Sequence, residues 1–263
     1  MLKLVDYFGG KVALSAWIEN QFAPHQTYVE VFGGGAGVLL NKKRSKIEVL
    51  NDFENEIVNL YQVMRDHGDE MKRLCELTPY ARTEYDNARQ ESADPVERAR
   101  RTIIKCHFGI GDSLARRTGF HTSKQVNQSH AITYANWCEK IPEIVERFRG
   151  VVIENLDFQK VIEKYDHSET LFYLDPPYVL DTRTSSGSYT ADFESEDHTR
   201  LLSCIKNLQG MVVLSGYDHE SYDLLGWKKV KLMARTQGSS VREECLWLCP
   251  KIECREKQIE FQL

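Results

Sequence analysis

The segment YLDPPY at residues 173–178 ends an apolar run with a carboxylate, two consecutive prolines and an aromatic ring. Asp175 offers two acceptor oxygens, and Pro176 adds a carbonyl acceptor because proline keeps its C=O while lacking an N–H. The Pro176–Pro177 pair restricts the backbone and would hold that carbonyl in a fixed direction. Tyr178 supplies a ring that could stack on a planar ligand. The same four residues could instead form a proline-rich turn, with Asp175 as a cap and Tyr178 in packing.

A glycine-rich loop follows an earlier apolar run, in the segment EVFGGGAGVLL at residues 30–40. Gly33, Gly34, Gly35 and Gly37 would let the backbone turn sharply and approach a ligand closely, and we expect a helix to follow. Loops of this kind occur with NAD, FAD and S-adenosylmethionine, and a tight structural turn is the alternative.

An acidic residue, Asp52, follows the next apolar run in the segment VLNDFEN. A carboxylate near this place commonly accepts hydrogen bonds from the hydroxyls of a ribose. Asp52 could also serve as the N-cap of the next helix. The order of strand, glycine loop, helix, strand and acid favours a nucleoside ligand, but it does not separate NAD from S-adenosylmethionine.

The YLDPPY segment does separate these two ligands. The exocyclic amine of adenine is a poor nucleophile because its lone pair is delocalised into the ring. Two acceptors that take its two hydrogens would favour a pyramidal nitrogen, and Asp175 and the rigidly held carbonyl of Pro176 are suited to that task. The base must first leave the duplex, because the amine is inaccessible inside it. The methyl of a sulfonium is already activated and requires no strong general base, whereas an NAD enzyme offers no account of the two prolines.

Alternating strands and helices are expected to position these residues. Near-continuous apolar runs indicate parallel strands covered on both faces, at residues 27–32, 46–50, 151–156, 170–177 and 211–217. Helices are expected at 55–66 and at 195–208, the latter with Ser195 as its N-cap. Two late runs, at 228–234 and 244–250, are expected to add a terminal hairpin. The pattern predicts a doubly wound α/β fold.

The alternation is interrupted between residues 74 and 141, which predicts an inserted and mainly helical subdomain within a catalytic domain formed by 1–73 and 142–263. The net charge of the chain is −5, yet residues 96–125 hold a local excess of basic side chains. The basic residues are Arg98, Arg100, Arg101, Lys105, Arg116, Arg117 and Lys124. A basic face on an acidic body is the pattern expected where one surface meets phosphates.

Composition bounds the protein class. The 263 residues, 41% of them hydrophobic, suffice for one large α/β domain or a catalytic domain with a small insertion. The seven cysteines form no C-x-x-C pair, and the spacing of Cys245, Cys249 and Cys254 supports no zinc site, so no metal is implied and reduced thiols are expected. No apolar run approaches the roughly 20 residues needed to span a bilayer, and no export signal is evident. We therefore expect no membrane partner and a cytoplasmic protein of a bacterial or phage-infected cell.

The sequence resembles the Dam-type DNA adenine-N6 methyltransferases over nearly its whole length. DYFGGK at 6–11 is similar to the family's Trp-Ala-Gly-Gly-Lys segment, with Tyr7 in place of Trp and Phe8 in place of Ala. VEVFGGGAGV resembles its Phe-x-Gly-Gly-Gly loop, LNDFENEIVNLY its Asn-Asp-x-Asn segment, and YLDPPY matches its catalytic tetrapeptide without change. VREECLWL, near the end, also resembles a family element.

The resemblance implies a Rossmann-like, S-adenosylmethionine-dependent enzyme that methylates N6 of a flipped adenine in double-stranded DNA, as in restriction–modification. It implies that Tyr7, Lys11, Asp52 and Asp175 contact the cofactor. Lys11 would suit the cofactor carboxylate, and Tyr7 its adenine ring or apolar edge. Further cofactor contacts are expected from Phe32 near the methionine end, from Gly33 and Gly35 in the loop, and from Asp157 near the adenine.

DNA contacts are expected in two places. The resemblance puts target recognition in the insertion, where FGIGDSLARRTGF is similar to the version in phage-encoded adenine methyltransferases. Arg116 and Arg117 are candidates for contacts to phosphate or to a guanine edge, and Lys124 is a third candidate. In the polar segment 179–194, expected to be a mobile loop that orders on DNA, Arg183 and Tyr189 are candidate substrate contacts. Each of these side chains could instead be a solvated surface residue.

Other functions on this sequence remain open. The same fold could methylate adenine in RNA or N4 of cytosine in DNA, although the aspartate and the Tyr7–Lys11 segment favour adenine in DNA. A non-catalytic DNA-binding module is a further alternative, but it would not need Asp-Pro-Pro-Tyr at the tip of a strand.

Overall fold

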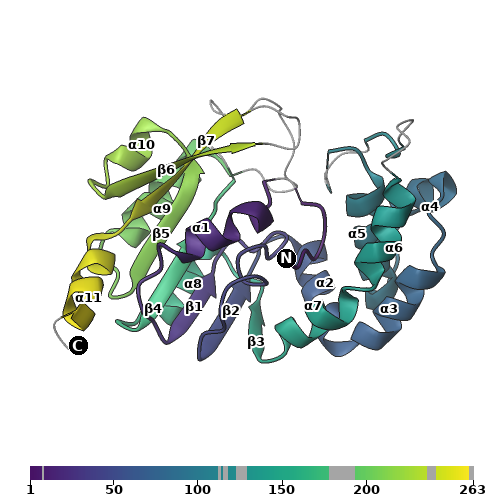
Figure 1. Cartoon of the computed structure of the whole chain (residues 1–263), viewed down its shortest axis with the longest axis horizontal. Coiled ribbons are helices and arrows are strands. Elements are labelled where there is room, and N and C mark those ends of the chain that lie inside the picture. The colour runs from purple at the N-terminus through teal and green to yellow at the C-terminus, as the bar shows by residue number, and fades with distance from the viewer. Residues whose placement is uncertain are drawn as a thin grey trace.

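A seven-stranded sheet forms the centre of the computed structural model, which describes residues 1–7, 9–111, 114, 118–122, 129–177, 193–235 and 241–260 (Figure 1). The strand order is β3-β2-β1-β4-β5-β7-β6. The strands are β1 (Thr27–Glu30), β2 (Ile47–Asn51), β3 (Val151–Glu154), β4 (Thr170–Leu174), β5 (Met211–Tyr217), β6 (Lys228–Arg235) and β7 (Val241–Leu248).

Strands β1 to β5 pair in parallel, and β7 joins β5 and β6 in antiparallel register. The five predicted parallel strands and the terminal hairpin are therefore confirmed. Within the sheet, β2 and β3 lie on one side of β1, and β4 and β5 lie on its other side. The chain leaves β1 toward β2 and leaves β4 in the opposite direction, toward β5. Open α/β sheets bind ligands at the carboxyl ends of the strands at such a switch in strand order.

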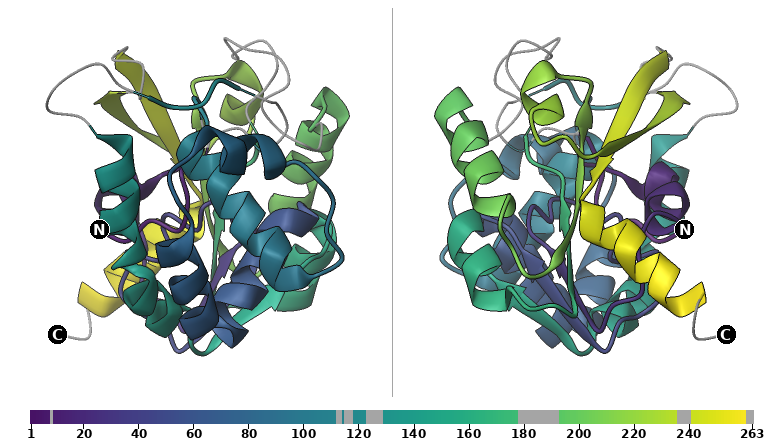
Figure 2. Two further views of the ribbon diagram at one scale, coloured as in Figure 1. Left: turned by 90° about the vertical axis from the view of Figure 1, so that its right-hand side faces the viewer. Right: turned by 90° about the vertical axis from the view of Figure 1, so that its left-hand side faces the viewer.

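Helices cover both faces of the sheet. Figure 2 shows α8 and α9 on one face and α1 and α11 on the other. The helices are α1 (Ser15–Glu19), preceded by a 3-10 turn η1 (Val12–Leu14), α2 (Asn55–Asp66), α3 (Gly68–Leu77), α4 (Arg82–Asn87), α5 (Pro95–Phe108), α6 (His130–Cys138), α7 (Ile141–Phe148), α8 (Phe158–Tyr165), α9 (Ser195–Ile205), α10 (Glu220–Asp223) and α11 (Pro250–Glu260). Across the described ranges, none of these helices combines the length and apolarity that a bilayer crossing requires.

Helices α3 to α7 gather beside the sheet in a helical lobe, with α2 packed against α5 and α7 (Figure 1). An aromatic cluster forms the interior of the lobe: the ring of Phe108 lies 4.2 Å from that of Tyr80 and 4.9 Å from that of Tyr134, measured between centroids. Between 74 and 141 the described residues contain helices and one isolated bridge, Gly109 to Phe120. The predicted helical character of the interruption is confirmed.

The predicted helix after the glycine loop is wrong, because residues 33–42 form successive turns instead. Gly34 has φ +48° and Ala36 has φ +52°, and these left-handed conformations cannot continue a right-handed helix. The N-cap predicted for the later helix is also wrong. Ser195 is its first helical residue, and Glu194 caps it through a capping box with Asp197.

Three of the seven basic side chains of residues 96–125 pair with glutamates. Arg98 Nη2 lies 2.6 Å from Glu56 Oε1. On the same helix, Arg100 and Arg101 both pair with Glu97 at 2.7 Å. The charges of these three arginines are offset by neighbouring carboxylates, and the basic face expected over residues 96–125 stays a prediction.

A buried ion cluster ties the lobe to the sheet. Glu48 of β2 accepts two hydrogen bonds from Arg147 of α7, at 2.6 and 2.9 Å, and one from Lys42 at 2.7 Å. Burial opposes ionisation of Glu48, but these two cations overcome it and hold the pKa of the carboxyl below its ordinary value.

Replacing Arg147 should therefore destabilise the protein strongly. We expect Arg147→Ala to lower the free energy of unfolding by about 3 kcal/mol, because a buried carboxylate loses its bidentate partner. The control is Arg149→Ala, whose side chain is 78% exposed and pairs with Glu146 on the surface; it should cost less than about 1 kcal/mol. Equal losses for the two variants in urea denaturation would contradict this role of the cluster.

Candidate active site

A cavity of about 260 Å³ opens where the carboxyl ends of β1, β2 and β4 meet. It collects most of the residues predicted for the site, namely Tyr7, Lys11, Phe32, Gly33, Gly35, Asp52, Asp157, Asp175 and Pro177. Pro176 directly follows Asp175 in the chain but does not line the cavity wall. Tyr178, Arg116, Arg117, Lys124, Arg183 and Tyr189 lie outside the described residues, so their predicted roles stay predictions.

The glycine loop is fixed by contacts to β2 and α2. Gly34 N–H donates to Asp52 Oδ2 at 2.7 Å, and Tyr61 O–H donates to the Gly34 carbonyl at 2.6 Å. A Cβ added at Gly34 would lie 2.8 Å from Cε1 of Tyr7, so the ring of Tyr7 rests directly on the loop backbone. Tyr61 was not anticipated from the sequence, where it reads only as part of the apolar face of a helix.

Asp52 joins the second strand to this loop. Besides the bond from Gly34, it accepts the N–H of Glu54 at 2.8 Å. Burial raises the pKa of Asp52, and the backbone donors oppose that rise. Asp52 is not the N-cap of α2, since Glu54 occupies that position. The alternative of a purely capping role is therefore excluded.

Asp175, at the tip of β4, faces a buried ammonium. Lys11 Nζ lies 3.0 Å from Asp175 Oδ2 and 3.8 Å from Glu244 Oε2, and it donates to the Gly9 carbonyl at 3.0 Å. Burial raises the pKa of Asp175, while Lys11 lowers it. The site therefore places a desolvated carboxylate and its counter-cation against one wall of the cavity.

A second buried carboxyl, Glu30, lines the cavity at the end of β1. It is 2% exposed and accepts hydrogen bonds from Tyr28 O–H and Leu39 N–H, both at 2.7 Å. Burial raises the pKa of Glu30 to about 8, against the effect of these donors. Glu30 was not predicted as a site residue, although an acid inside the apolar run TYVEVF indicates a buried carboxyl.

An arginine and two aromatic rings form the rim near Asp157. Arg200 Nη2 lies 2.8 Å from Asp157 Oδ2, and its guanidinium carbon lies 4.2 Å from the ring centroid of Phe158. Phe32 packs against Phe158, with ring centroids 5.9 Å apart. Asp157 also caps α8, through the N–H of Gln159 at 3.0 Å. Neither Arg200 nor Phe158 was anticipated, because α9 and α8 meet here only in the folded chain.

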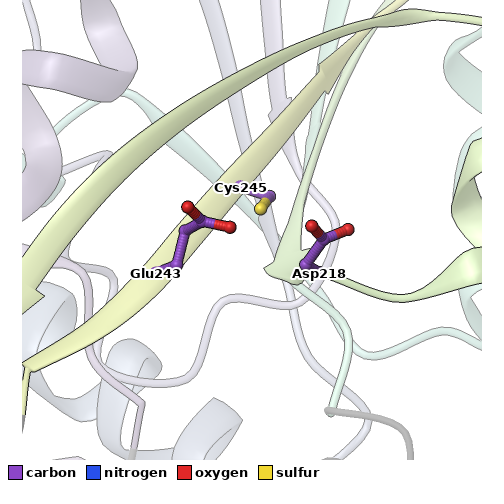
Figure 3. Close-up of side chains that lie close together, drawn as sticks. All are labelled: Asp218, Glu243 and Cys245. Atoms are coloured by element: carbon purple, nitrogen blue, oxygen red, sulfur yellow. The ribbon is translucent and has the colours of Figure 1, made fainter.

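A group of potential metal ligands, Asp218, Glu243 and Cys245, lies apart from the cavity between β5 and β7 (Figure 3). Lys231 Nζ lies 2.6 Å from Asp218 Oδ2 and 2.7 Å from Glu243 Oε2, and Lys229 pairs with Asp218 at 2.7 Å. Burial raises the pKa of the Cys245 thiol to about 11, which disfavours the thiolate that binds metals. This group is better described as a lysine–carboxylate network.

The fold and the cavity define a class of protein: a Rossmann-like α/β enzyme with a nucleoside-type site at the switch in strand order. The sequence model of the D12 class N6 adenine-specific DNA methyltransferases matches residues 7–233. The chain belongs to this family, whose reaction is methyl transfer to N6 of adenine in DNA. The predicted family, fold and reaction are thereby confirmed.

Curated relatives agree with this membership. The Type II methyltransferase M1.LlaDCHI of Lactococcus lactis subsp. cremoris is 28% identical over 214 residues, which cover 72% of this chain and 74% of that protein. The Type II methyltransferase M.MjaIII of Methanocaldococcus jannaschii is 25% identical, over 78% of this chain and 79% of that protein. The DNA adenine methylase of Haemophilus influenzae is 24% identical, over 87% and 85% respectively.

The contact between Tyr7 and the glycine loop predicts that a side-chain methyl group added at Gly34 would lower activity. We expect Gly34→Ala to lower the rate of DNA methylation at least about tenfold, because its Cβ would displace the Tyr7 ring from the cavity. The matched control is Gly150→Ala, which has the same left-handed strain at φ +79° but no atom within 4 Å of the added Cβ. Equal activities of the two variants in a radiolabelled methyl-transfer assay would refute this role of the contact.

Proposed function

We propose that this chain transfers a methyl group from S-adenosylmethionine to N6 of an adenine flipped out of duplex DNA. One observation supports this above all others. Asp175, followed directly by two prolines, shares a single cavity with the glycine loop and Asp52. A nucleoside-type site thus adjoins a carboxylate suited to an exocyclic amine.

The cavity residues fit S-adenosylmethionine by their shape and chemistry. The loop backbone lies so close to Tyr7 that a side chain at Gly34 would fill the intervening space. Asp52 offers a carboxylate at the place suited to ribose hydroxyls. Phe53, next in the chain and 65% exposed at the cavity mouth, offers an apolar surface for a purine ring. When bound, the cofactor would supply a methyl group on an electrophilic sulfonium.

On the acceptor side, Asp175 and the Pro176 carbonyl would bind the two hydrogens of the adenine amine. Both are acceptors, so they orient the amine and increase the availability of its lone pair at the same time. The amine would become cationic as its bond to the methyl carbon forms and the S–C bond of the sulfonium breaks. The ionised carboxylate would stabilise that charge until N6 loses a proton to water. Stacking of Tyr178 on the base is part of the same proposal.

Lys11 would keep Asp175 ionised. A carboxylate that leaves water favours its protonated form, and a protonated Asp175 would lose part of its capacity to accept hydrogens. An ammonium at 3.0 Å opposes this protonation. The contact with the cofactor carboxylate, expected from the resemblance, remains a further proposal for the same side chain.

The helical lobe is proposed to bind the DNA target. It lies beside the cavity, and its α5 arginines are already paired with glutamates. Contacts of Arg116, Arg117 and Lys124 to phosphates or base edges are part of the same proposal. Incubation of the protein with S-adenosylmethionine and either duplex DNA or RNA, followed by digestion to nucleosides, tests the reaction. N6-methyladenine from the DNA is the expected product, and N4-methylcytosine, or methylation of the RNA alone, would contradict the proposal.

Removing the charge of Asp175 should nearly abolish the reaction. We expect Asp175→Asn to lower kcat by about 10²- to 10³-fold or more, because the amide cannot stabilise a cationic amine as a carboxylate does. Binding of S-adenosylmethionine should be partly retained. The control is Asp218→Asn, at an exposed aspartate, which should leave kcat unchanged. Near-normal turnover of Asp175→Asn would show that the assigned role is wrong.

The elevated pKa of Asp175 predicts a pH dependence. Methyl transfer should fall on the acid side as this carboxyl becomes protonated, at a pH above the ordinary range for aspartate. Because Lys11 lowers the pKa of Asp175, Lys11→Gln should move this loss of rate to higher pH. Single-turnover rates at saturating cofactor separate this shift from weaker cofactor binding. The role of Lys11 would be contradicted if the rate of Lys11→Gln fell at the same pH as that of the wild type, or at a lower pH.

A further inference from the structure

The N-terminal segment, residues 1–7, lies between the sheet and the helical lobe and is held on both sides (Figure 1). On the sheet side, Leu2 and Asn41 exchange two hydrogen bonds of 2.7 Å. Leu4 and Val5 are fully buried. Asn41 also donates to the carbonyl of Gly37, so this side of the segment is joined to the end of the glycine loop.

On the lobe side, two residues hold the segment. Trp137 of α6 donates its Nε1–H to the carbonyl of Lys3 at 2.8 Å. His107 of α5 places Nδ1 3.2 Å from Asp6 Oδ2. The rings of His107 and Trp137 pack against each other with centroids 4.3 Å apart. Both side chains are buried.

The segment ends at the cavity. Tyr7 follows Asp6 directly, its ring lies on Gly34, and its carbonyl accepts the N–H of Gly10 at 3.0 Å. Trp137, His107, Lys3 and Asp6 do not line the cavity, whereas Tyr7 does. The segment therefore gives these side chains a direct connection, through the chain itself, to a residue that lines the cavity.

We propose that Trp137 and His107 are positioning residues, which hold Lys3 and Asp6 and thereby fix the Tyr7 ring against the glycine loop. The inference rests on the proposed function, in which Tyr7 contacts S-adenosylmethionine. It makes the affinity for the cofactor dependent on two helices of the lobe that never touch it. The packing of the lobe therefore contributes to cofactor binding as well as to its own stability.

Calorimetric titration with S-adenosylmethionine tests this inference. Trp137→Phe keeps an aromatic ring but removes the Nε1 donor, and it should raise Kd about three- to tenfold. The matched control is Trp227→Phe, at a half-buried tryptophan next to β6, which should bind as the wild type does. In a Tyr7→Leu background, Trp137→Phe should produce no further increase, because its effect acts through Tyr7.

Three results would decide against the inference. They are wild-type Kd in Trp137→Phe, an equal rise in Trp227→Phe, and an undiminished effect of Trp137→Phe in the Tyr7→Leu background. If Trp137→Phe is unfolded at the assay temperature, the titration uses Asp6→Asn instead, because Asp6 lies nearer the surface. This replacement should also raise Kd. Failure of the wild-type chain to bind S-adenosylmethionine would instead refute the proposed function.

Discussion

The candidate active site is built around one ion pair, between Asp175 at the tip of β4 and the buried Lys11 that follows the N-terminal segment. A carboxylate removed from water is unstable in its charged form unless a cation or donors compensate. Lys11 provides this compensation from a position only 5% exposed, and Glu244 of β7 lies on its other side. The compensation of Asp175 therefore depends on a segment far from it in the sequence.

The topology explains why these parts meet. The strand order switches between β1 and β4, and the crevice at their carboxyl ends receives the glycine loop from one side and Asp175 from the other. The left-handed backbone at Gly34 gives the loop its turn and lets the Tyr7 ring approach closely. Asp52 then fixes the loop to the end of β2. The cavity is consequently shaped by backbone geometry as much as by side chains.

Local patterns in the sequence predicted the parallel strands, the hairpin, helix α2 and the residues of the cavity, because each depends on neighbouring residue types. They failed where distant residues decide the outcome. Arg98 was counted in a basic excess expected to meet phosphates, whereas in the folded protein it pairs with Glu56, which is distant in the sequence. The contact of Arg200 with Asp157 likewise joins elements far apart in the chain. The helix expected after the glycine loop failed for a local reason, the positive φ of Ala36, which is unusual for a residue with a Cβ.

The central claim is that Asp175, kept ionised by Lys11, and the Pro176 carbonyl together bind the amine that is methylated. A crystal structure of the protein with a cofactor analogue and a duplex carrying its target adenine tests this most directly. The account predicts that both acceptors lie about 2.7–3.2 Å from N6 of the flipped base, with the Lys11 ammonium still beside Asp175. An adenine whose N6 contacts other groups, with Asp175 directed away from it, would contradict the account.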